Sequence, residues 1–230
     1  MIAERAAAVR ERIARAAERA RRRAAEVTLV AVTKTHPPER VREAYAAGLL
    51  DFGENKVQEA EAKIAALDDL RPPLRWHLVG HLQTNKAKRA ATLFDRIHSL
   101  DSIQLAHKLE HYAATAAKTL EVLVQVDLAG EATKHGADEA HLFPLLEEMR
   151  GMRSIRAVGL MVLPPFVDDP ETVRPYFRRL RALRDRAVEQ KLLLGAELSM
   201  GMSQDFEVAI EEGSTLVRIG TSIFGERRAG

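Results

Sequence analysis

Residues Glu26–Val32 read EVTLVAV, an almost continuous apolar and β-branched run that decides how the rest of the chain folds. Such a run is typical of a β-strand that is buried on both faces, as strands are in a parallel sheet covered by helices. Residues 33–35 (TKT) are polar, and the prolines at positions 37–38 favour the start of a helix that Gly48 ends. The segment therefore predicts one unit of strand, polar loop and helix.

The same pattern recurs along the chain. The further predicted strands are Leu50–Phe52, Trp76–Val79, Arg96–Ser99, Glu121–Asp127, Ile155–Leu163, Glu197–Met200 and Thr215–Ile219. Helical segments separate them, which predicts βαβ units and a parallel sheet of the α/β class. Eight such units in a little over 200 residues predict a closed (β/α)8 TIM barrel, with an open doubly wound sheet as the alternative. We expect residues 1–230 to form a single domain, with residues 1–25 as an additional N-terminal helix.

Composition limits the class of protein. The chain has 230 residues, a formal net charge of +2, 5% aromatic residues and no cysteine. A thiolate zinc site and a cysteine nucleophile are therefore excluded, and nothing predicts a basic, aromatic surface for nucleic acid. The longest apolar runs, such as Val27–Val32, are too short to span a bilayer. Because the N-terminus also lacks the features of a signal peptide, we expect a cytoplasmic protein with no membrane partner.

Functional residues of a (β/α)8 barrel lie at the carboxyl ends of its strands, and Lys34 directly follows the first of them. A lysine is costly to bury without a partner. In a partly apolar pocket its amine has a lowered pKa and attacks carbonyl carbon to form a Schiff base. A reactive amine, a side chain that reaches solvent and an ordinary ion pair with Glu54 are all consistent with this position.

Small residues follow the last two strands, in LSMGMS (198–203) and VRIGT (217–221). Glycine lets backbone N–H groups approach an anion, as in the phosphate sites of barrels, although Gly201 and Gly220 also suit tight turns. Arg218 lies at the end of the eighth strand and is permanently charged. Together with Lys34 these loops predict a phosphorylated ligand that carries a carbonyl group, either pyridoxal phosphate or a phosphosugar.

The histidines do not predict a metal site. His77 and His81 are four residues apart on a strand and a loop, with no acidic residue at a suitable spacing, so we interpret them as structural or cofactor-packing residues. His98 and His135 show no ligand pattern either. Asp127 at a strand end is equally consistent with a catalytic base and with a cap of the following turn.

A resemblance to a known family covers nearly the whole chain, from about Val27 to Gly225. The motifs that carry it are VAVTKTHP, FGENKVQE, WHLVGHLQTNK, GLMVLPP, LSMGMSQDFEVAI and STLVRIGTSIFG, in this order. Through them the chain resembles the YggS/PROSC family of pyridoxal phosphate homeostasis proteins. The resemblance implies the barrel of the N-terminal domain of alanine racemase, with pyridoxal phosphate as the cofactor.

The resemblance also implies roles for individual residues. Lys34 would hold pyridoxal phosphate as an internal aldimine, and Asn55 would line the cofactor. Ser199 would bind the phosphate through its hydroxyl group. Gly220 and Thr221 would bind the phosphate as well. No catalytic residue and no metal ligand is implied.

Arg218 would face the pyridine nitrogen, according to the same resemblance. A permanently charged donor disfavours protonation of that nitrogen, and an unprotonated ring is a weaker electron sink. Alanine racemase also uses a tyrosine from a second domain, whereas Tyr45, Tyr112 and Tyr176 all fall in predicted outer helices here. A carrier of the cofactor therefore fits better than a two-base racemase.

The leading hypothesis is a protein that carries and buffers pyridoxal phosphate, without obligatory catalytic activity. Its expected partners are the cofactor and enzymes that lack it, and we expect a monomer. A weak pyridoxal phosphate-dependent amino-acid racemase is the main alternative. A phosphosugar lyase or isomerase that uses Lys34 on its substrate, and a scaffold for partner proteins, are the other two.

Overall fold

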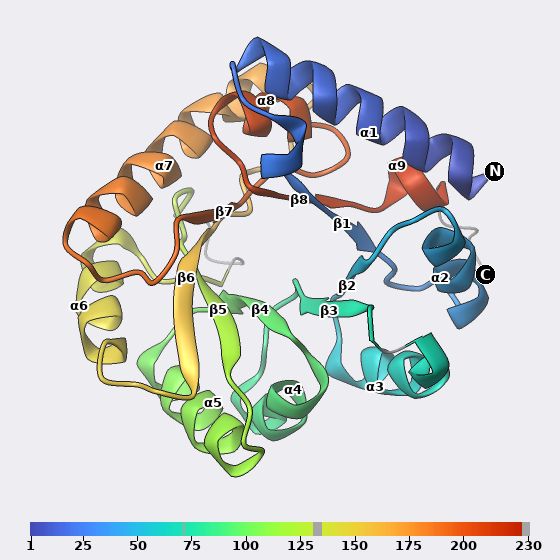
Figure 1. The fold of residues 1–230 in the computed structure, drawn as a ribbon. Helices are drawn as coiled ribbons and strands as arrows, with labels where there is room; N and C mark the ends of the chain where they lie inside the picture. Colours follow the sequence, from blue (N-terminus) through green and yellow to red (C-terminus); the bar gives the residue numbers. More distant parts are fainter. Residues whose placement is uncertain (71, 131–134, 227–230) are drawn as a thin grey trace.

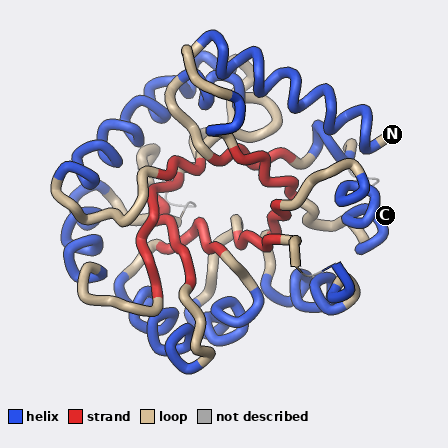
Figure 2. The backbone as a smooth tube through the Cα atoms, viewed as in Figure 1, coloured by secondary structure: helices blue, strands red, loops and turns tan. Residues whose placement is uncertain are grey.

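Eight parallel strands form a closed barrel in the computed structural model of this chain, which describes residues 1–70, 72–130 and 135–226. The strands follow one another around the ring in chain order, and β8 pairs with β1 to close it. Figure 1 shows the strands as an inner ring and the helices as an outer one, and Figure 2 shows the same two layers along the backbone. The predicted (β/α)8 barrel is confirmed, and the alternative of an open sheet is wrong.

The strand positions also agree with the sequence. The strands are β1 Thr28–Val32, β2 Asp51–Glu54, β3 Arg75–Leu78, β4 Arg96–Leu100, β5 Leu120–Gln125, β6 Ile155–Met161, β7 Glu197–Ser199 and β8 Leu216–Ile219. No end differs from its predicted position by more than two residues. Hydrophobic runs therefore located every strand, because each strand buries apolar side chains against the outer helices.

The helices cover the outside of the barrel. They are α1 Ile2–Arg19, α2 Pro38–Ala46, α3 Val57–Ala65, α4 Ala87–Leu93, α5 Ile103–Thr115, α6 Glu139–Met149, α7 Arg174–Glu189, α8 Phe206–Glu211 and α9 Thr221–Phe224. Short 3₁₀ turns are Ala24–Glu26, Asp68–Leu70, Thr84–Lys86 and Pro170–Val173. The additional helix α1 lies across α8 and α9 (Figure 1), where its apolar stripe is buried.

The N-terminal helix is shorter than predicted. It ends at Arg19 instead of continuing to residue 25, because Arg21 adopts a left-handed backbone with φ of +54°. The next residue, Arg22, then donates hydrogen bonds to the carbonyl oxygens of Ile210 (2.9 Å) and Ser214 (2.8 Å). The arginine run therefore ends the helix and ties it to the carboxyl end of α8, which helix propensity alone does not reveal.

The apolar core has two parts. The larger part lies between the strands and the helices and includes the buried stripe of α1. The smaller part fills the barrel interior and contains Val30, Val32, Val79, Leu123, Val158, Met161 and Leu216. Because side chains alternate along a strand, Arg218 shares the interior face of β8 with Leu216. The interior is therefore apolar only in part, and polar side chains fill the rest.

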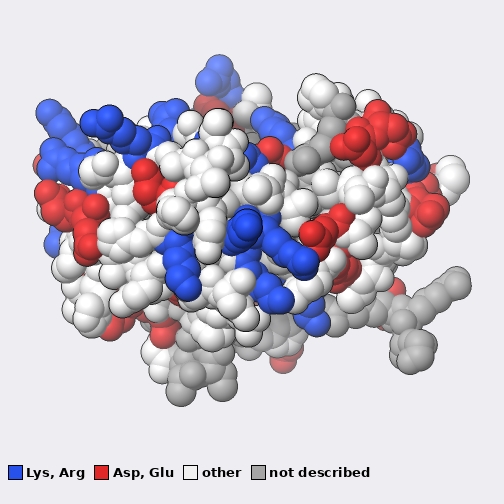
Figure 3. Space-filling model, turned by 90° about the horizontal axis from the view of Figure 1, so that it is seen from below, with Lys and Arg blue, Asp and Glu red and all other residues white. Residues whose placement is uncertain are grey.

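The outer surface carries both signs of charge. On the face shown in Figure 3, basic and acidic side chains are interspersed over the surface. No helix in the described part of the chain is both long and apolar enough to cross a membrane.

Gly159 tests the close packing of β6 on β7. A Cβ atom at Gly159 would lie 2.1 Å from the backbone oxygen of Glu197, so Gly159→Ala should force the two strands apart. We expect this overpacking to lower the free energy of unfolding by about 1–3 kcal/mol in urea denaturation. Gly151→Ala is the matched control, since nothing lies within 4 Å of a Cβ atom there. Equal urea midpoints for the two variants would contradict this description of the barrel.

Candidate functional site

The residues expected to bind the cofactor lie on four strands that adjoin in the ring. Lys34 and Asn55 follow β1 and β2, Ser199 ends β7, and Arg218 belongs to β8. Closure of the barrel pairs Val30 of β1 with Arg218, which are 188 positions apart in the sequence. The structure thus brings these residues to one end of the barrel, as the sequence predicts for parallel strands.

A buried polar cluster anchors the loop that carries Lys34. The carboxylate oxygen Oε1 of Glu54 accepts hydrogen bonds from the Thr33 hydroxyl (2.5 Å) and from the Lys63 ammonium (2.5 Å). Lys63 also donates to the backbone oxygen of Thr33 at 2.7 Å. Burial raises the pKa of Glu54, and the hydrogen bond from Lys63 opposes that rise. The ends of β1 and β2 are therefore tied to α3 just before Lys34.

Sequence reasoning missed Lys63 and gave an ion pair of Lys34 with Glu54 as only one of its alternatives. The ion pair of Glu54 is with Lys63, which is only 4% exposed on the inner side of α3. A signal was present, because Lys63 lies three residues after the buried Ala60 and so falls on the apolar face of the helix. A lysine on such a face needs a buried carboxylate.

The turn after Lys34 is also fixed. Thr35 has a left-handed backbone, with φ of +66°, which is rare for a β-branched residue. Its amide donates to Oε1 of Glu59 at 2.5 Å, and Glu59 contacts Lys63 at 3.2 Å. The same buried cluster therefore holds both sides of Lys34, whose own side chain is half-buried.

A chain of hydrogen bonds runs through the barrel interior from Arg218. The Arg218 guanidinium contacts the Ser199 hydroxyl at 2.5 Å, and Ser199 contacts Nδ1 of His98 at 2.7 Å. Nε2 of His98 contacts Nδ1 of His77 at 2.9 Å, and Nε2 of His77 contacts the Asp51 carboxylate at 3.0 Å. Asp51 is the first residue of β2, so the chain crosses from one end of the barrel toward the other.

The two ends of this chain set the direction of every hydrogen bond in it. A guanidinium can only donate and an ionised carboxylate can only accept. Ser199 therefore accepts from Arg218 and donates to His98, His98 donates through Nε2 to His77, and His77 donates through Nε2 to Asp51. Both histidines are neutral in this arrangement, each in a single tautomer.

The pKa shifts of His98, His77 and Asp51 agree with two neutral histidines and an ionised carboxylate. Burial holds the pKa of His98 well below its usual value, and protonation of the neighbouring His77 would lower it further. Burial also lowers the pKa of His77, against the opposing hydrogen bond to Asp51. Burial favours protonation of Asp51, but hydrogen bonds from His77 and Arg75 outweigh it and lower the pKa of that carboxyl group.

Arg218 is a buried cation without a carboxylate partner at ion-pair distance within the described residues. It is 4% exposed, and burial lowers its pKa to about 10, although the charge of Asp205 partly offsets this. Its second contact is a hydrogen bond to the backbone oxygen of Val162 at 2.9 Å. Buried charges are normally paired, so this guanidinium fits an acceptor or an anion brought by a ligand.

Loops of small residues surround Arg218. Gly201 has a φ of +96°, and a Cβ atom there would lie 2.7 Å from Cβ of Ala209, so its glycine is explained by the turn and by packing on α8. The Ser222 amide faces the Ser203 hydroxyl at 3.4 Å and links the loop after β7 with the loop after β8. Gly220 and the exposed Thr221 directly precede Ser222, at the start of α9.

The contacts of Asp127 and His81 bear on the roles that the sequence left open for these two residues. Oδ1 of Asp127 accepts hydrogen bonds from the amides of Ala129 and Gly130, both at 3.0 Å, so Asp127 caps the turn after β5. His81 is not isolated, because it lies beside Asp101 and His135.

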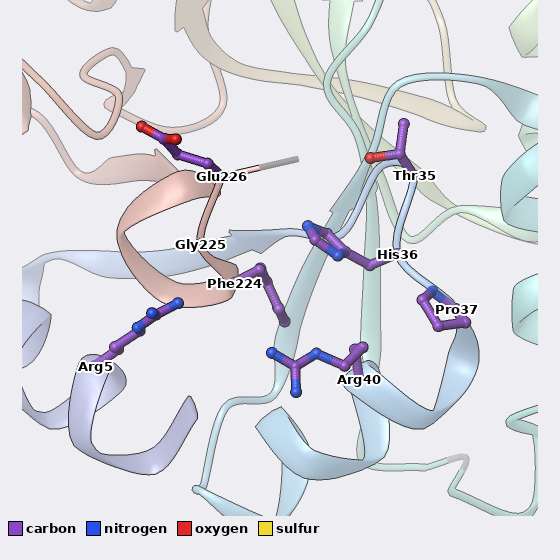
Figure 4. Close-up of a pocket in the computed structure, with 8 residues that line it drawn as sticks. All are labelled: Arg5, Thr35, His36, Pro37, Arg40, Phe224, Gly225 and Glu226. Carbon is purple, nitrogen blue, oxygen red and sulfur yellow. The ribbon is translucent and has the colours of Figure 1, made fainter. Parts of the chain in front are cut away.

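A cleft of about 830 Å³ lies at the rim of the barrel, next to the turn that follows Lys34. Figure 4 shows the Arg5 and Arg40 side chains pointing toward each other from α1 and α2, with His36 and Phe224 above them. The His36 ring contacts the Phe224 ring, with 5.0 Å between centroids. None of the six residues expected to bind the cofactor lines this cleft, so we do not assign the site to it.

Known proteins with similar sequences identify the family of this chain. The model of the family "Alanine racemase, N-terminal domain" matches residues 6–228. A pyridoxal phosphate homeostasis protein of Aquifex aeolicus is 47% identical over 225 residues, which is 98% of each chain. One from Pseudomonas aeruginosa is 44% identical over 230 residues, covering 100% of this chain and 97% of its own. This chain belongs to the family of pyridoxal phosphate homeostasis proteins.

Solved structures of this family have the same fold. PipY of Synechococcus elongatus without PLP covers 98% of this chain and 100% of its own, with a TM-score of 0.89 and 41% identity. The structure of PipY with PLP bound has a TM-score of 0.88 and 40% identity, with the same coverage. Alanine racemase of Clostridium difficile, at 13% identity, covers 89% of this chain and 53% of its own with a TM-score of 0.68, a likeness of fold alone.

Replacing Lys63 tests the anchor of the loop. Lys63→Met would leave the carboxylate of Glu54 buried and without its cation, so we expect a loss of about 3–5 kcal/mol in the free energy of unfolding. The exposed Lys88 provides the control, since Lys88→Met should change stability by less than about 0.5 kcal/mol. The double variant Glu54→Gln, Lys63→Met should recover part of the loss. A single variant as stable as the control would contradict the buried pair.

The buried histidines predict a loss of stability in mild acid. Below about pH 6.5 the unfolded chain binds protons that His77 and His98 cannot bind in the fold, because burial lowers their pKa. Stability should therefore fall as the pH falls, by up to about 1.4 kcal/mol per pH unit for each histidine. Urea denaturation of His98→Gln between pH 7.5 and 5.5 should show a shallower fall. His111→Gln, which changes an exposed histidine, should keep the full dependence of the free energy of unfolding on pH. If His98→Gln keeps that full dependence as well, His98 is not a buried neutral histidine.

Proposed function

We propose that residues 1–230 form one pyridoxal phosphate-binding domain that holds and buffers the cofactor, with Lys34 as its point of covalent attachment. The observation that carries this proposal is the buried Arg218 guanidinium, which has no ion-pair partner among the described residues and lies on β8, next to the strand β1 that precedes Lys34. The PLP-bound structure of PipY supports it, because that relative shares the fold over nearly the whole chain.

The bound cofactor supplies an aldehyde, a ring nitrogen and a dianionic phosphate. In this proposal the Lys34 amine meets the aldehyde carbon, and Asn55 lines the ring. Arg218 donates to the ring nitrogen, which satisfies a cation that burial otherwise leaves uncompensated. Gly220 and Thr221 bind the phosphate through backbone and hydroxyl donors.

Ser199 has a specific conflict to resolve in this site. Its hydroxyl carries one hydrogen, which the interior chain directs to His98 while Arg218 donates to the oxygen. Donation to a phosphate oxygen therefore requires Ser199 to give up its hydrogen bond to His98. We infer that cofactor binding and the interior chain compete for this hydrogen, so His98 adjusts how tightly the phosphate is held.

A carrier role is supported over racemization by two features. A charged Arg218 disfavours protonation of the ring nitrogen, so the bound ring is a poor electron sink. The three tyrosines lie on the outer helices α2, α5 and α7 and pack against the outer part of the core. In this proposal the protein acts as a cytoplasmic monomer and delivers cofactor to enzymes that lack it.

Lys34→Ala tests the attachment site. Wild-type protein incubated with pyridoxal phosphate should turn yellow, and sodium borohydride should reduce the new carbon–nitrogen double bond and leave the cofactor on Lys34. Peptide mass spectrometry locates the label. The variant should lose the absorbance and the label, whereas Lys56→Ala, which changes an exposed lysine in the next loop, should keep both. The assignment would be overturned if Lys34 carried no label in the wild-type protein and in Lys56→Ala, or if Lys34→Ala kept a normal spectrum.

A further inference from the structure

The interior chain of hydrogen bonds reaches solvent at the amino end of the barrel. Its last member, Asp51, lines a cavity of about 400 Å³ together with the first residues of β1 and β3. The Asp51 side chain is 10% exposed and pairs at 2.7 Å with Arg75, which is 60% exposed. His77 and His98, which lie between Asp51 and Ser199, are buried. A proton can therefore enter or leave the chain at Asp51, while Ser199 meets the proposed cofactor at the other end.

Donation from Ser199 to a phosphate oxygen permits two states of His98. If the His98 hydrogen stays on Nε2, the lone pair of Nδ1 faces the Ser199 oxygen across 2.7 Å. Two buried acceptors at that distance repel, and His98 loses a hydrogen bond. If the hydrogen lies on Nδ1 instead, His98 donates to Ser199, whose oxygen also accepts from Arg218. The second state satisfies every polar group here, so we expect the tautomer of His98 to reverse.

Reversal at His98 also changes His77. Nε2 of His98 then has no hydrogen and accepts from Nδ1 of His77 across 2.9 Å. His77 keeps its hydrogen bond to the ionised Asp51 only if its Nε2 carries a hydrogen as well, since two lone pairs would otherwise meet across 3.0 Å. In the structure Ser199, His98 and His77 hold one hydrogen each. The reversed chain holds one more, and solvent at Asp51 supplies it.

We propose that cofactor binding at Ser199 is coupled to the uptake of one proton from solvent by the His77–Asp51 pair. This inference rests on the proposed function, because it takes the cofactor phosphate as the acceptor for Ser199. The proton converts His77 to an imidazolium that donates to His98 and to the Asp51 carboxylate. No bond between heavy atoms forms or breaks. His77 and Asp51 are thus positioning residues that set the direction in which Ser199 donates.

Neighbouring charges oppose a positive His77 until the chain reverses. The charged side chains around the pair are Arg75 of β3, Arg96 of β4 with Glu121 of β5 and Glu197 of β7 beside it, and Arg10 of α1 at the cavity. Burial lowers the pKa of His77 most, the charges of Arg96 and Arg75 lower it further, and Asp51 opposes them. In the structure His98 donates to His77 and favours its neutral form, whereas in the reversed chain His98 accepts and favours the imidazolium.

Asp51→Asn separates the hydrogen bond from the proton. An asparagine amide accepts through its oxygen or donates through its nitrogen, so it serves both directions of the chain without an added proton. The probe is 4′-deoxypyridoxine 5′-phosphate, which keeps the ring and the phosphate but has no aldehyde to react with Lys34. Titration calorimetry between pH 7 and 8 gives its affinity. As the pH falls by one unit, affinity for the wild type should rise about tenfold relative to affinity for Asp51→Asn.

Asp69→Asn is the matched control, because Asp69 also pairs with an arginine, Arg42 at 2.6 Å, but lies on the outer surface. Its affinity for the probe should depend on pH as that of the wild type does. Circular dichroism checks that the variants are folded. Equal pH dependence in the wild type and in Asp51→Asn would overturn the proposal.

Nitrogen-15 NMR of histidine-labelled wild-type protein gives a second measurement that needs no change at Asp51. Saturation with the probe should move the His98 hydrogen from Nε2 to Nδ1 and should place hydrogens on both ring nitrogens of His77. The spectrum of His98→Gln identifies the His98 signals. A His98 ring that keeps its hydrogen on Nε2 with the probe bound would also overturn the proposal.

Failure of this inference is distinguishable from failure of the proposed function. Borohydride labelling of Lys34 together with equal pH dependence in the wild type and Asp51→Asn would remove the proton uptake and leave the cofactor site intact. If the wild type bound neither pyridoxal phosphate nor the probe, both the proposed function and the proton uptake would be wrong.

Discussion

The buried charge of Arg218 is the constraint on which the interior of this barrel depends. A guanidinium cannot lose its proton under ordinary conditions, so the fold must surround it with acceptors. The Ser199 hydroxyl and the backbone oxygen of Val162 are two such acceptors. From Ser199 the series of hydrogen bonds continues through His98 and His77 to Asp51. The carboxylate that ends the series lies near the opposite end of the barrel, which leaves the ligand side of Arg218 available for an acceptor from outside.

The same principle organises the loop that carries Lys34. Glu54 and Lys63 are both buried, and Thr33 supplies additional hydrogen bonds to both members of their ion pair. The backbone turn at Thr35 depends on Glu59, which also contacts Lys63. Stability and function are therefore linked, because the groups that compensate buried charge also position the residues proposed to bind the cofactor.

Sequence reasoning reached the fold because its signals are local. Glu26–Val32 and the seven later runs bury apolar side chains at short range, and their alternation with helices leaves few topologies. It missed Lys63 as the partner of Glu54, and it weighed His77 together with His81 but not with His98, which His77 contacts. Hydrogen bonds across the barrel interior join residues far apart in the sequence, as between His98 of β4 and Ser199 of β7, which are 101 positions apart, and no pattern within one strand reports them.

The sequence alone determined the barrel, its strand positions and the family motifs around Lys34 and Arg218, because hydrophobic periodicity and turn residues act over a few positions. Tertiary structure alone decided which polar groups meet: the chain from Arg218 to Asp51, the pairing of Glu54 with Lys63, and the meeting of His81 with Asp101 and His135. The physical reason is that closure of the barrel directs side chains from all eight strands into one interior and one mouth, where long-range contacts set charge and tautomer.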